Sequence, residues 1–468
     1  MALSDDESRT LRRLNARLLA DRRGTKDSPG FEVLDRYYDG IQLLQQLGLA
    51  VPAELREFVT IVAWPGTYVD AIAERCVGQG FRLPGEQEAD PELWRVWQAN
   101  DLDDEAPLAH TDAMVFGRSY VCVGANPDDE QTPLITVESP LEMTHEQSPA
   151  TRSTTSAARF YSDQSFGRRE SRATLYSRNS TVHVVRARRG WEEATDEEFE
   201  RDEHGAGMVM VEPMVNRARP HKRYGKSQMA RVIGLTDAAA RALTLAQVAT
   251  EVMGIPQRTA AGLTQQDFKD PKTGEMLTEW EAYFGAVWAT SNKDAKFHQF
   301  SAADLQNFKN IVTMYAELVA GVTGLPLRYM GQLATNPPSA DGIRADEARL
   351  IRQCEAVTEG PFGATWERTA RKVRRLQTGE DDPALAELEM VWRDPATPTR
   401  AQAADAAVKL YQAGVIPKRQ ARRDLGYSPV QIQNMEQEEA DAAAAGDPQL
   451  ERLARQLTPP PVPADAAA

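Results

Sequence analysis

The chain has 468 residues, 41% of them apolar and 26% charged, which is the composition of a globular protein with several domains. Its formal net charge of −15 argues against a surface that grips DNA tightly, because tight binding needs clustered cations, but it allows a surface past which DNA slides. No apolar run approaches the roughly 18–20 residues of a membrane span, and the acidic N-terminus has no signal-peptide pattern, so neither a membrane nor secretion is expected.

The first 233 residues are predicted to begin with helices and to continue as a β-rich region. Leu11, Leu14 and Leu18 recur at helical spacing. Leu93, Trp94 and Trp97 fall on one face of a later helix, where core packing explains them. Short runs of β-branched and aromatic residues then predict antiparallel strands at Met114–Val123, Leu134–Val137, Ala158–Tyr161, Ala173–Tyr176, Thr181–Val185 and Met208–Val215.

A long helix is predicted next, with Thr236 as its N-cap and an end near Met253. Residues 256–300 then predict a small mixed unit. Its expected elements are an extended piece near Thr259–Leu263, a helix through Trp280–Trp288 and a closing strand near Lys296–Phe300.

The helix predicted over residues 302–323 carries the clearest periodicity in the chain. Its apolar residues are spaced alternately three and four positions apart, a period that suits packing against a neighbouring long helix. One chain is not expected to bury this apolar seam fully. The seam consists of Leu305, Phe308, Val312, Tyr315, Val319 and Val322, and Gly324 and Pro326 end the helix.

A loop rich in helix breakers follows from Gly331 to Ser339, and a long helix then runs from about residue 340 to 376. Gly360 and Pro361 predict a kink in it, because proline lacks the backbone N–H and clashes with the preceding turn. Residues 396–445 predict a last helical unit, and the Pro/Ala-rich tail over 446–468 is expected to be largely disordered.

Three enzymatic motifs are incomplete. Gly225-Lys226-Ser227 resembles the end of a phosphate-binding loop, but the glycine required five residues earlier is replaced by Pro220. His145-Glu146 begins like a zinc-protease motif, but Pro149 stands where the second histidine is needed. Carboxylates such as Asp101–Asp104 could hold Mg²⁺ in a nuclease, yet acids in an acidic protein usually form a solvated face.

Metals, cofactors and disulfides are not expected elsewhere in the chain. Cys76, Cys122 and Cys354 are widely spaced, which indicates three reduced thiols. The six histidines are scattered. A basic run near the end of the long helix has two explanations that both stay open: favourable charge at a helix C-terminus, or a contact with DNA or an acidic neighbour. This run comprises Arg368, Arg371, Lys372, Arg374 and Arg375.

Six stretches of the chain, in one order, match a known family. They are Tyr37–Gly40, Val77–Arg82, Leu93–Asp103, His110–Val121, Gly225–Thr250 with Pro256–Arg258, and Ser339–Arg344. In these stretches the sequence resembles portal proteins of tailed bacteriophages, in particular the siphophage type common in actinobacteriophages. The stretches extend from about residue 30 to about residue 430, and no single one has the specificity of a catalytic motif.

The resemblance implies an α+β portal fold with an α/β wing, a long helical stem, a small α/β clip and a helical crown. The corresponding parts of this chain are residues 1–233 for the wing, 234–255 and 301–326 for the two stem helices, 256–300 for the clip, 327–339 for the tunnel loop, 340–395 for the long kinked helix that returns to the wing, and 396–445 for the crown.

The resemblance also implies a function without catalysis. Portal subunits form a homomeric ring, a dodecamer in the virion, at the capsid vertex through which double-stranded DNA is packaged and ejected. The implied partners are the terminase large subunit, the head–tail adaptor, the major capsid and scaffolding proteins, and DNA that passes without sequence specificity. Assembly would take place in the host cytoplasm.

Site residues follow from the same resemblance. The apolar seam would join neighbouring subunits. The tunnel loop would offer Gln332, Leu333, Thr335 and Asn336 to DNA, and the clip would offer Lys269, Lys272, Trp280, Tyr283 and Trp288 to the terminase or the adaptor. Two alternatives remain: a different ring component of the virion, although adaptors are usually shorter, and a DNA-processing enzyme.

Overall fold

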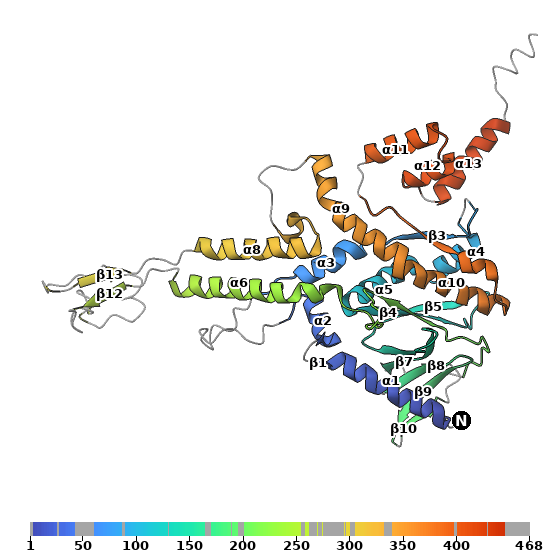
Figure 1. The fold of residues 1–468 in the computed structure, drawn as a ribbon, viewed down its shortest axis with the longest axis horizontal. Helices are drawn as coiled ribbons and strands as arrows, with labels where there is room; N and C mark the ends of the chain where they lie inside the picture. The colour runs from blue at the N-terminus through green and yellow to red at the C-terminus, as the bar shows by residue number, and fades with distance from the viewer. Residues whose placement is uncertain are drawn as a thin grey trace, which may run out of the picture. The chain divides into compact units, whose positions relative to one another are not determined.

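The computed structural model describes residues 3–25, 28–42, 60–86, 89–129, 131–163, 170–188, 190–194, 201–253, 258–261, 269, 274, 294, 296–299, 305–331, 339–396, 400–427 and 429–444. The chain divides into two compact units, Met1–Pro395 and Ala396–Ala468. Figure 1 labels most of their helices and strands.

The first unit opens with helices, as predicted. Ser4 and Glu7 form a capping box at the start of the first helix, whose buried face carries Leu11, Leu14 and Leu18. Asp90 caps the helix that buries Leu93 and Trp97. The helices are α1 (Asp5–Arg23), α2 (Phe31–Tyr38), α3 (Trp64–Ala73), α4 (Pro91–Ala99) and α5 (Leu102–Phe116).

Helix α5 explains one sequence interpretation and corrects another. Its first turn contains Asp103 and Asp104, where carboxylates interact favourably with the helix dipole, so the acidic cluster has a structural explanation. The strand predicted from Met114 begins only at Arg118, because Met114–Phe116 still belong to α5. Gly117, in the left-handed region at φ 93°, makes the turn between them.

The β-rich region forms antiparallel sheets, which confirms the α+β class. One sheet has the order β11 (Val211–Val215), β4 (Arg118–Gly124), β5 (Leu134–Glu138). A second has the order β10 (Gly190–Glu193), β9 (Thr181–Ala187), β8 (Glu170–Tyr176), β7 (Thr154–Asp163), β6 (Met143–Gln147). Two smaller pairs are β1 (Gly24–Thr25) with β2 (Ser28–Pro29), and β14 (Glu389–Trp392) with β3 (Gly78–Arg82).

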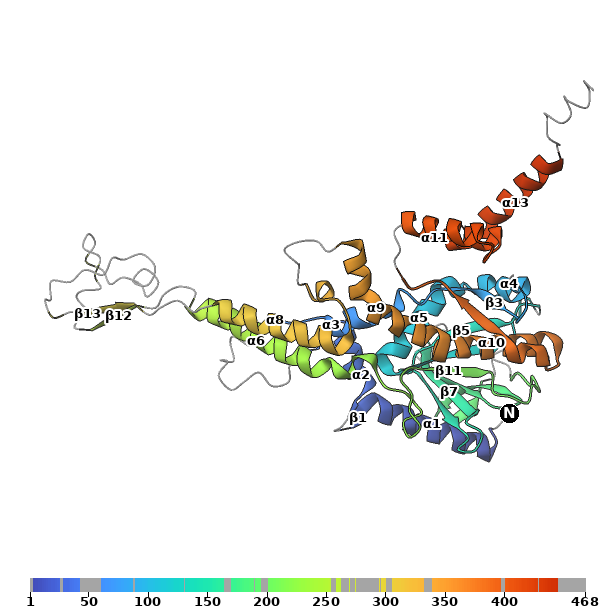
Figure 2. The same ribbon diagram turned by 45° about the horizontal axis from the view of Figure 1, so that its top comes forward.

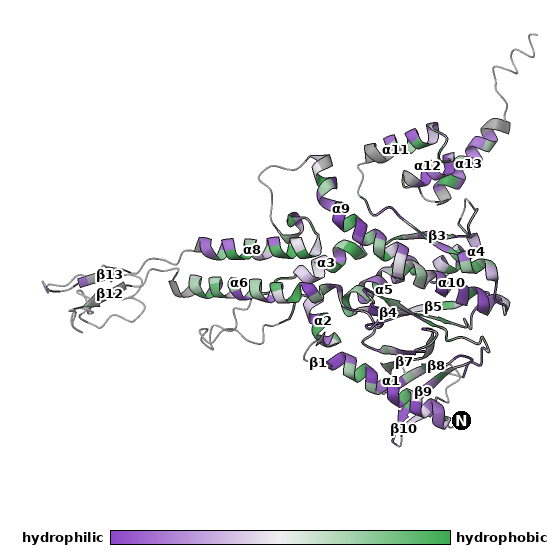
Figure 3. Cartoon of the chain, viewed as in Figure 1, coloured by the Kyte–Doolittle hydropathy of each residue, from purple (hydrophilic) through white to green (hydrophobic). Residues whose placement is uncertain are grey.

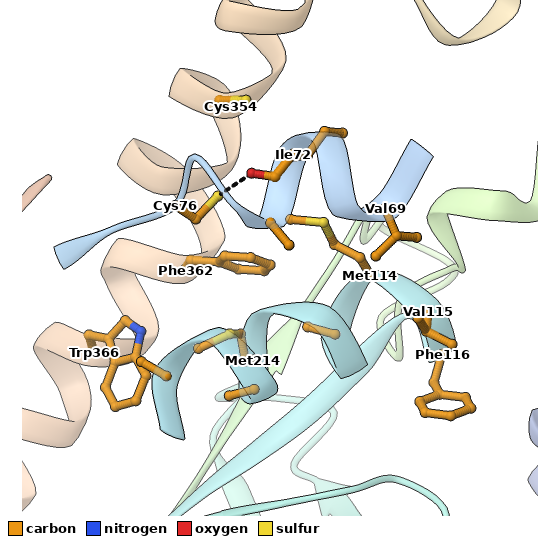
Figure 4. Packing of buried hydrophobic residues seen from close by; sticks show 14 of the residues in the cluster. Val69, Ile72, Cys76, Met114, Val115, Phe116, Met214, Cys354, Phe362 and Trp366 are labelled. Carbon is orange, nitrogen blue, oxygen red and sulfur yellow. Dashed lines mark hydrogen bonds between the residues drawn. The ribbon is translucent and has the colours of Figure 1, made fainter. Parts of the chain in front are cut away.

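The largest core joins α3, α5 and the long C-terminal helices of this unit (Figure 4). Trp366 packs edge-on against Trp97, and its indole N–H donates to His110 Nε2 over 2.9 Å. His110 also stacks on Phe362, so it has a structural role. Cys76 and Cys354 are buried free thiols in this core, as expected.

The long helix predicted after residue 340 is present and kinked. It consists of α9 (Ala340–Val357), a π-helical segment η6 (Thr358–Phe362) and α10 (Gly363–Thr378). Gly360 departs from helical geometry at φ −97° and ψ −109°, one residue before Pro361. The Gly-Pro kink is therefore confirmed, and its cause is the lost backbone hydrogen bond.

The second unit is helical in its described part. It contains α11 (Arg400–Gln412), α12 (Lys418–Asp424) and α13 (Pro429–Ala444). Lys418 and Arg422 on α12 both pair with Glu439 on α13, and Arg419 pairs with Glu436 over 3.4 Å. The tail predicted to be disordered, 446–468, lies outside the described residues.

Candidate functional site

Two long helices of the first unit, α6 (Ile233–Met253) and α8 (Leu305–Thr323), lie side by side in both views of the ribbon (Figures 1 and 2). Ala239 and Ala240 on α6 are both buried. Figure 3 shows apolar residues along both helices. The pair is the structural element to which the sequence assigned the stem.

The start of α6 differs from the sequence prediction. The short 3-10 helix η3 (Gln228–Arg231) comes first, and α6 begins at Ile233, so Thr236 is not its N-cap. The Thr236 hydroxyl instead donates to the Val232 carbonyl over 3.1 Å inside the helix. Tyr37 donates to Asp237 over 2.9 Å, and burial together with this carboxylate raises the pKa of Tyr37. This contact ties α2 to the first turns of α6.

The apolar seam of α8 is largely used within one chain. Val319 is fully buried, and Val312 and Tyr315 pack against the main core. Phe308 is half-buried. The expectation that the whole seam faces a neighbouring subunit is therefore wrong for Val319, because its side chain has no surface left to offer. Leu305 begins α8, and its side chain lies outside the described part of the chain.

A different stripe of α8 stays exposed. Ile311, Met314, Leu318 and Val322 follow one another at intervals of three, four and four residues, which places them on one side of the helix. Their exposed fractions run from 38% to 47%, so each keeps a large part of its surface in contact with solvent. We call these four residues the α8 stripe. Only Val322 belongs to both the predicted seam and the α8 stripe.

Strands β12 (Arg258–Ala261) and β13 (Lys296–Gln299) pair between α6 and α8 in the sequence. Their antiparallel register joins Arg258 to Gln299 and Ala261 to Lys296, which confirms the extended piece and the closing strand predicted there. Lys269 is exposed. The other candidate clip residues, Lys272, Trp280, Tyr283 and Trp288, lie outside the described residues.

The segment interpreted as a tunnel loop is partly helical at its start. Thr323 bonds to the Val319 carbonyl over 2.7 Å and accepts from the Leu325 N–H, which ends α8. A 3-10 helix, η5 (Leu327–Met330), follows and buries Met330. The prediction of a loop from 327 is thus wrong for these four residues. Gln332, Leu333, Thr335 and Asn336 lie outside the described residues.

Charged groups connect the two flanks of that segment. Arg328 on η5 pairs with Asp346 over 3.0 Å and also with Glu347, both on α9. Glu347 is buried and lies 3.6 Å from Arg75, which follows α3. Arg75 further donates to the Tyr329 hydroxyl over 3.1 Å and to the Pro395 carbonyl over 2.8 Å. The ends of the segment are therefore anchored to each other and to the core.

The basic run on α10 has partners inside the chain. Arg368 and Lys372 pair with Glu212 over 2.8 and 3.1 Å, and Arg374 pairs with Asp90 over 2.9 Å. Arg371 donates to the Leu385 carbonyl, and Arg375 lies 3.8 Å from Asp381. Acids and carbonyls of the same chain therefore hold all five cations. Neither of the two explanations left open for this run, charge at a helix C-terminus or a contact with DNA or an acidic neighbour, is needed.

The enzymatic motifs find no support in the described parts of the chain. Ser227 caps η3 by accepting from Met229 N–H, so its hydroxyl has a structural role. His145 is fully buried beside Tyr120, 3.0 Å from its hydroxyl. No group of three or more metal-ligating side chains is found among the described residues. No described helix has the length and apolar composition needed to cross a membrane.

The family model described as "Phage portal protein, SPP1 Gp6-like" matches residues 21–446. The chain belongs to the phage portal protein family. Two curated members share most of its length. The portal protein of Mycobacterium phage D29 is 42% identical over 422 residues, and that of Mycobacterium phage L5 is 41% identical over 422 residues. In each comparison the match covers 88% of this chain and 85% of the relative.

Solved structures similar to this portal-family chain come from gene transfer agent particles. A chain of the virion of a native particle matches with a TM-score of 0.45 and 12% identity, covering 87% of this chain and 95% of that one. A chain of the neck of an empty particle, computed with C6 symmetry, matches with a TM-score of 0.44 and 13% identity, covering 82% and 95%.

Two features of this portal-family chain escaped sequence reasoning. The α8 stripe could have been found, because its spacing is helical and its residues are large and apolar. The seam next to it has a more regular spacing, and the sequence pattern therefore favoured the seam. The Arg75–Glu347–Arg328 cluster carries no local signal, because its members are far apart in the sequence and only the fold brings them together.

Proposed function

We propose that this protein forms a closed homomeric ring, a dodecamer in the assembled particle, at one vertex of a phage capsid. Membership of the portal family supports this proposal. The observation that supports a ring is the α8 stripe. Its four large apolar side chains are exposed along one helix, and a single chain leaves them uncovered. A heterologous contact between copies, repeated around an axis until it closes, would bury the stripe.

Double-stranded DNA is proposed to pass through this ring during packaging and ejection. The segment from 332 to 338 has the sequence Gln-Leu-Ala-Thr-Asn-Pro-Pro and carries no charge. Its flanks are anchored through Arg328 and Asp346. Side chains such as Gln332 and Asn336 can exchange weak hydrogen bonds with phosphates without trapping a moving duplex, and the net charge of −15 favours low friction.

The partners are proposed from the family and from the exposed position of Lys269. The unit between α6 and α8 would dock the terminase large subunit and later the head–tail adaptor, through residues such as Lys272, Trp280, Tyr283 and Trp288. The major capsid and scaffolding proteins would surround the ring. The protein would assemble in the host cytoplasm, reside at the portal vertex of the virion, and catalyse no reaction.

Lysine substitutions in the loop test the conduit. In a ring, Gln332→Lys with Asn336→Lys would place many positive charges at one height of the channel. DNA movement should slow or stop, and added salt should restore it, because phosphate attraction is screened. Gln332→Ser with Asn336→Ser is the matched control and should package DNA normally. Normal packaging and ejection by the lysine variant at low salt would exclude this loop from the tunnel.

A further inference from the structure

A cleft of about 920 Å³ opens in the first unit, and no residue of α6 or α8 lines it. Its walls come from the β6–β7 turn, the end of β11 and the start of α10. This volume lies near the upper end of the range found for ligand sites in proteins. The cleft therefore has room for a ligand larger than a single small ion.

The charge of the cleft is strongly one-sided. Its lining holds five cationic side chains, Arg152, Arg178, Arg223, Arg368 and Lys372, against one carboxylate, Glu212. Glu212 is already engaged by Arg368 and Lys372, at 2.8 and 3.1 Å. The carboxylate is thus not available to neutralise the other three cations. In a chain with a net charge of −15, this concentration of positive charge is unusual.

Three guanidinium groups of the cleft keep donors free for a ligand. Arg178 donates one N–H to the Gly207 carbonyl over 3.2 Å, and Arg223 donates one to the Pro220 carbonyl over 3.0 Å. Within the described part of the chain, no ion pair includes Arg152, Arg178 or Arg223. Each guanidinium carries five N–H donors, so most of the donors in the cleft are unused.

The backbone that carries these arginines is held in place. The turn before β7 is closed by hydrogen bonds from Arg152 N–H to the Ser148 carbonyl and from Ser148 N–H to the Ser153 carbonyl, both 2.9 Å. The loop that carries Arg223 is fixed where Gly225 meets Gly117: a Cβ at Gly225 would lie 2.0 Å from the Gly117 carbonyl oxygen. A preorganised site loses less free energy on ordering when a ligand binds.

The positive region continues along the loop. No acid occurs between Pro213 and Thr236, whereas six cations do: Arg217, Arg219, Lys222, Arg223, Lys226 and Arg231. Partial burial, followed by the nearby cations, lowers the pKa of Lys226. Arg219 and Lys222 are exposed on the outer turn of this loop and do not line the cleft.

We propose that this cleft binds an acidic peptide segment of a partner protein. Carboxylates suit the free guanidinium groups, because arginine and carboxylate form two parallel charge-assisted hydrogen bonds. Apolar side chains of the segment would contact Met208, Val209 and Pro213, and its backbone would meet the hydroxyls of the β6–β7 turn.

Duplex DNA fits this site less well. The duplex is stiff over about 150 base pairs, so it cannot bend into a cleft of this size. It would meet the exposed cations Arg219 and Lys222 and leave the interior of the cleft empty. The two kinds of ligand therefore depend on different arginines and lysines, and substitution distinguishes them. The proposal does not depend on the tunnel assignment.

The test compares two charge reversals of equal size in the full-length protein. Arg152→Glu with Arg178→Glu alters the cleft, and Arg219→Glu with Lys222→Glu alters the outer turn. The probe is a short fluorescein-labelled peptide of glutamate and leucine. The cleft variant should weaken its binding by at least about tenfold, and the outer-turn variant by less than about threefold. The same peptide with glutamine in place of glutamate should not bind.

A second variant guards against misfolding. Ala364→Trp narrows the cleft without changing its charge and should also weaken peptide binding. Equal losses in the two charge-reversed variants would overturn the proposal. So would a short DNA duplex that displaces the peptide from the cleft at lower concentration. Binding by dissociated subunits but not by assembled protein would assign the cleft to a neighbouring copy and would likewise overturn it.

Discussion

Arg328 and Asp346 form an ion pair of 3.0 Å that joins the residues entering the 332–338 segment to the helix that leaves it. Glu347, next to Asp346, is buried between Arg328 and Arg75. The two acids have different environments: Asp346 is half exposed and Glu347 is almost fully buried. Their contributions to stability should therefore differ, even though they contact the same arginine.

Glu347→Gln should destabilise the protein by about 2 kcal/mol, because it removes the buried carboxylate that Arg75 and Arg328 share. Asp346→Asn is the control and should cost less than about 1 kcal/mol, since exposed ion pairs contribute little. Denaturant unfolding of both variants measures the difference. Equal effects would show that burial of Glu347 does not determine the strength of this anchor.

His110 should make stability depend on pH. Burial lowers the pKa of His110 from 6.5 to about 3. Between these two pH values the unfolded chain binds a proton at His110, and the folded chain does not. Stability is therefore complete above about pH 6.5 and falls as the pH drops toward 3, by at most about 1.4 kcal/mol per pH unit. His110→Gln keeps an acceptor for the Trp366 indole and removes the titration.

The free energy of unfolding, measured between pH 7 and pH 4.5, checks this expectation. One such group changes it by at most about 1.4 kcal/mol per pH unit. The pH dependence should be shallower in His110→Gln than in the natural protein. His145, His183 and His204, whose pKa values burial also lowers, remain in both proteins and contribute to the residual slope. Identical slopes would mean that His110 is not neutral and buried in the folded protein.

Gly225→Ala should be more harmful than Gly379→Ala, although the two glycines have similar backbone φ angles. Gly225 and Gly379 have φ of 79° and 74°, so alanine is strained at both. Only at Gly225 does an added Cβ collide with backbone, 2.0 Å from the Gly117 carbonyl oxygen. We expect an additional loss of about 2 kcal/mol at Gly225, measured by thermal unfolding. Similar losses at the two sites would contradict the close packing of these loops.

The α8 stripe should control assembly. Leu318→Glu places a carboxylate on the stripe and should reduce the ring population by at least about tenfold at a fixed protein concentration, because burying the charge costs more than burying leucine gains. Lys309→Glu adds the same side chain to an exposed position of α8 off the stripe and should assemble normally. Analytical ultracentrifugation compares the two. Unchanged assembly of Leu318→Glu would remove the stripe from the subunit contact.

Local sequence patterns predicted the helices, strands and kinks that depend on neighbouring residues in the chain. The kink at Gly360-Pro361, the strands around Ala158 and Ala173, and α8 itself follow from residue type and periodicity. The sequence did not predict which other elements these helices and strands pack against. The 3.5-residue seam indicated a helix–helix contact, but the sequence could not distinguish α6 of the same chain from a helix of another copy.

The sequence also did not show which groups the charged side chains contact. The basic run on α10 was compatible with DNA, and only the fold brings Glu212 and Asp90 against it. Conversely, the arginines of the cleft come from three turns that lie far apart in the sequence. Arg152, Arg178 and Arg223 become one feature only when strands β6 to β11 bring their turns together.

Electron microscopy of the purified protein tests ring formation most directly. We expect closed rings with a central hole, in which the same contact repeats between all subunits. Leu318→Glu should yield far fewer rings under the same conditions. Particles that remain single subunits at every concentration, or that assemble into open filaments without closure, would show that the protein does not form a ring.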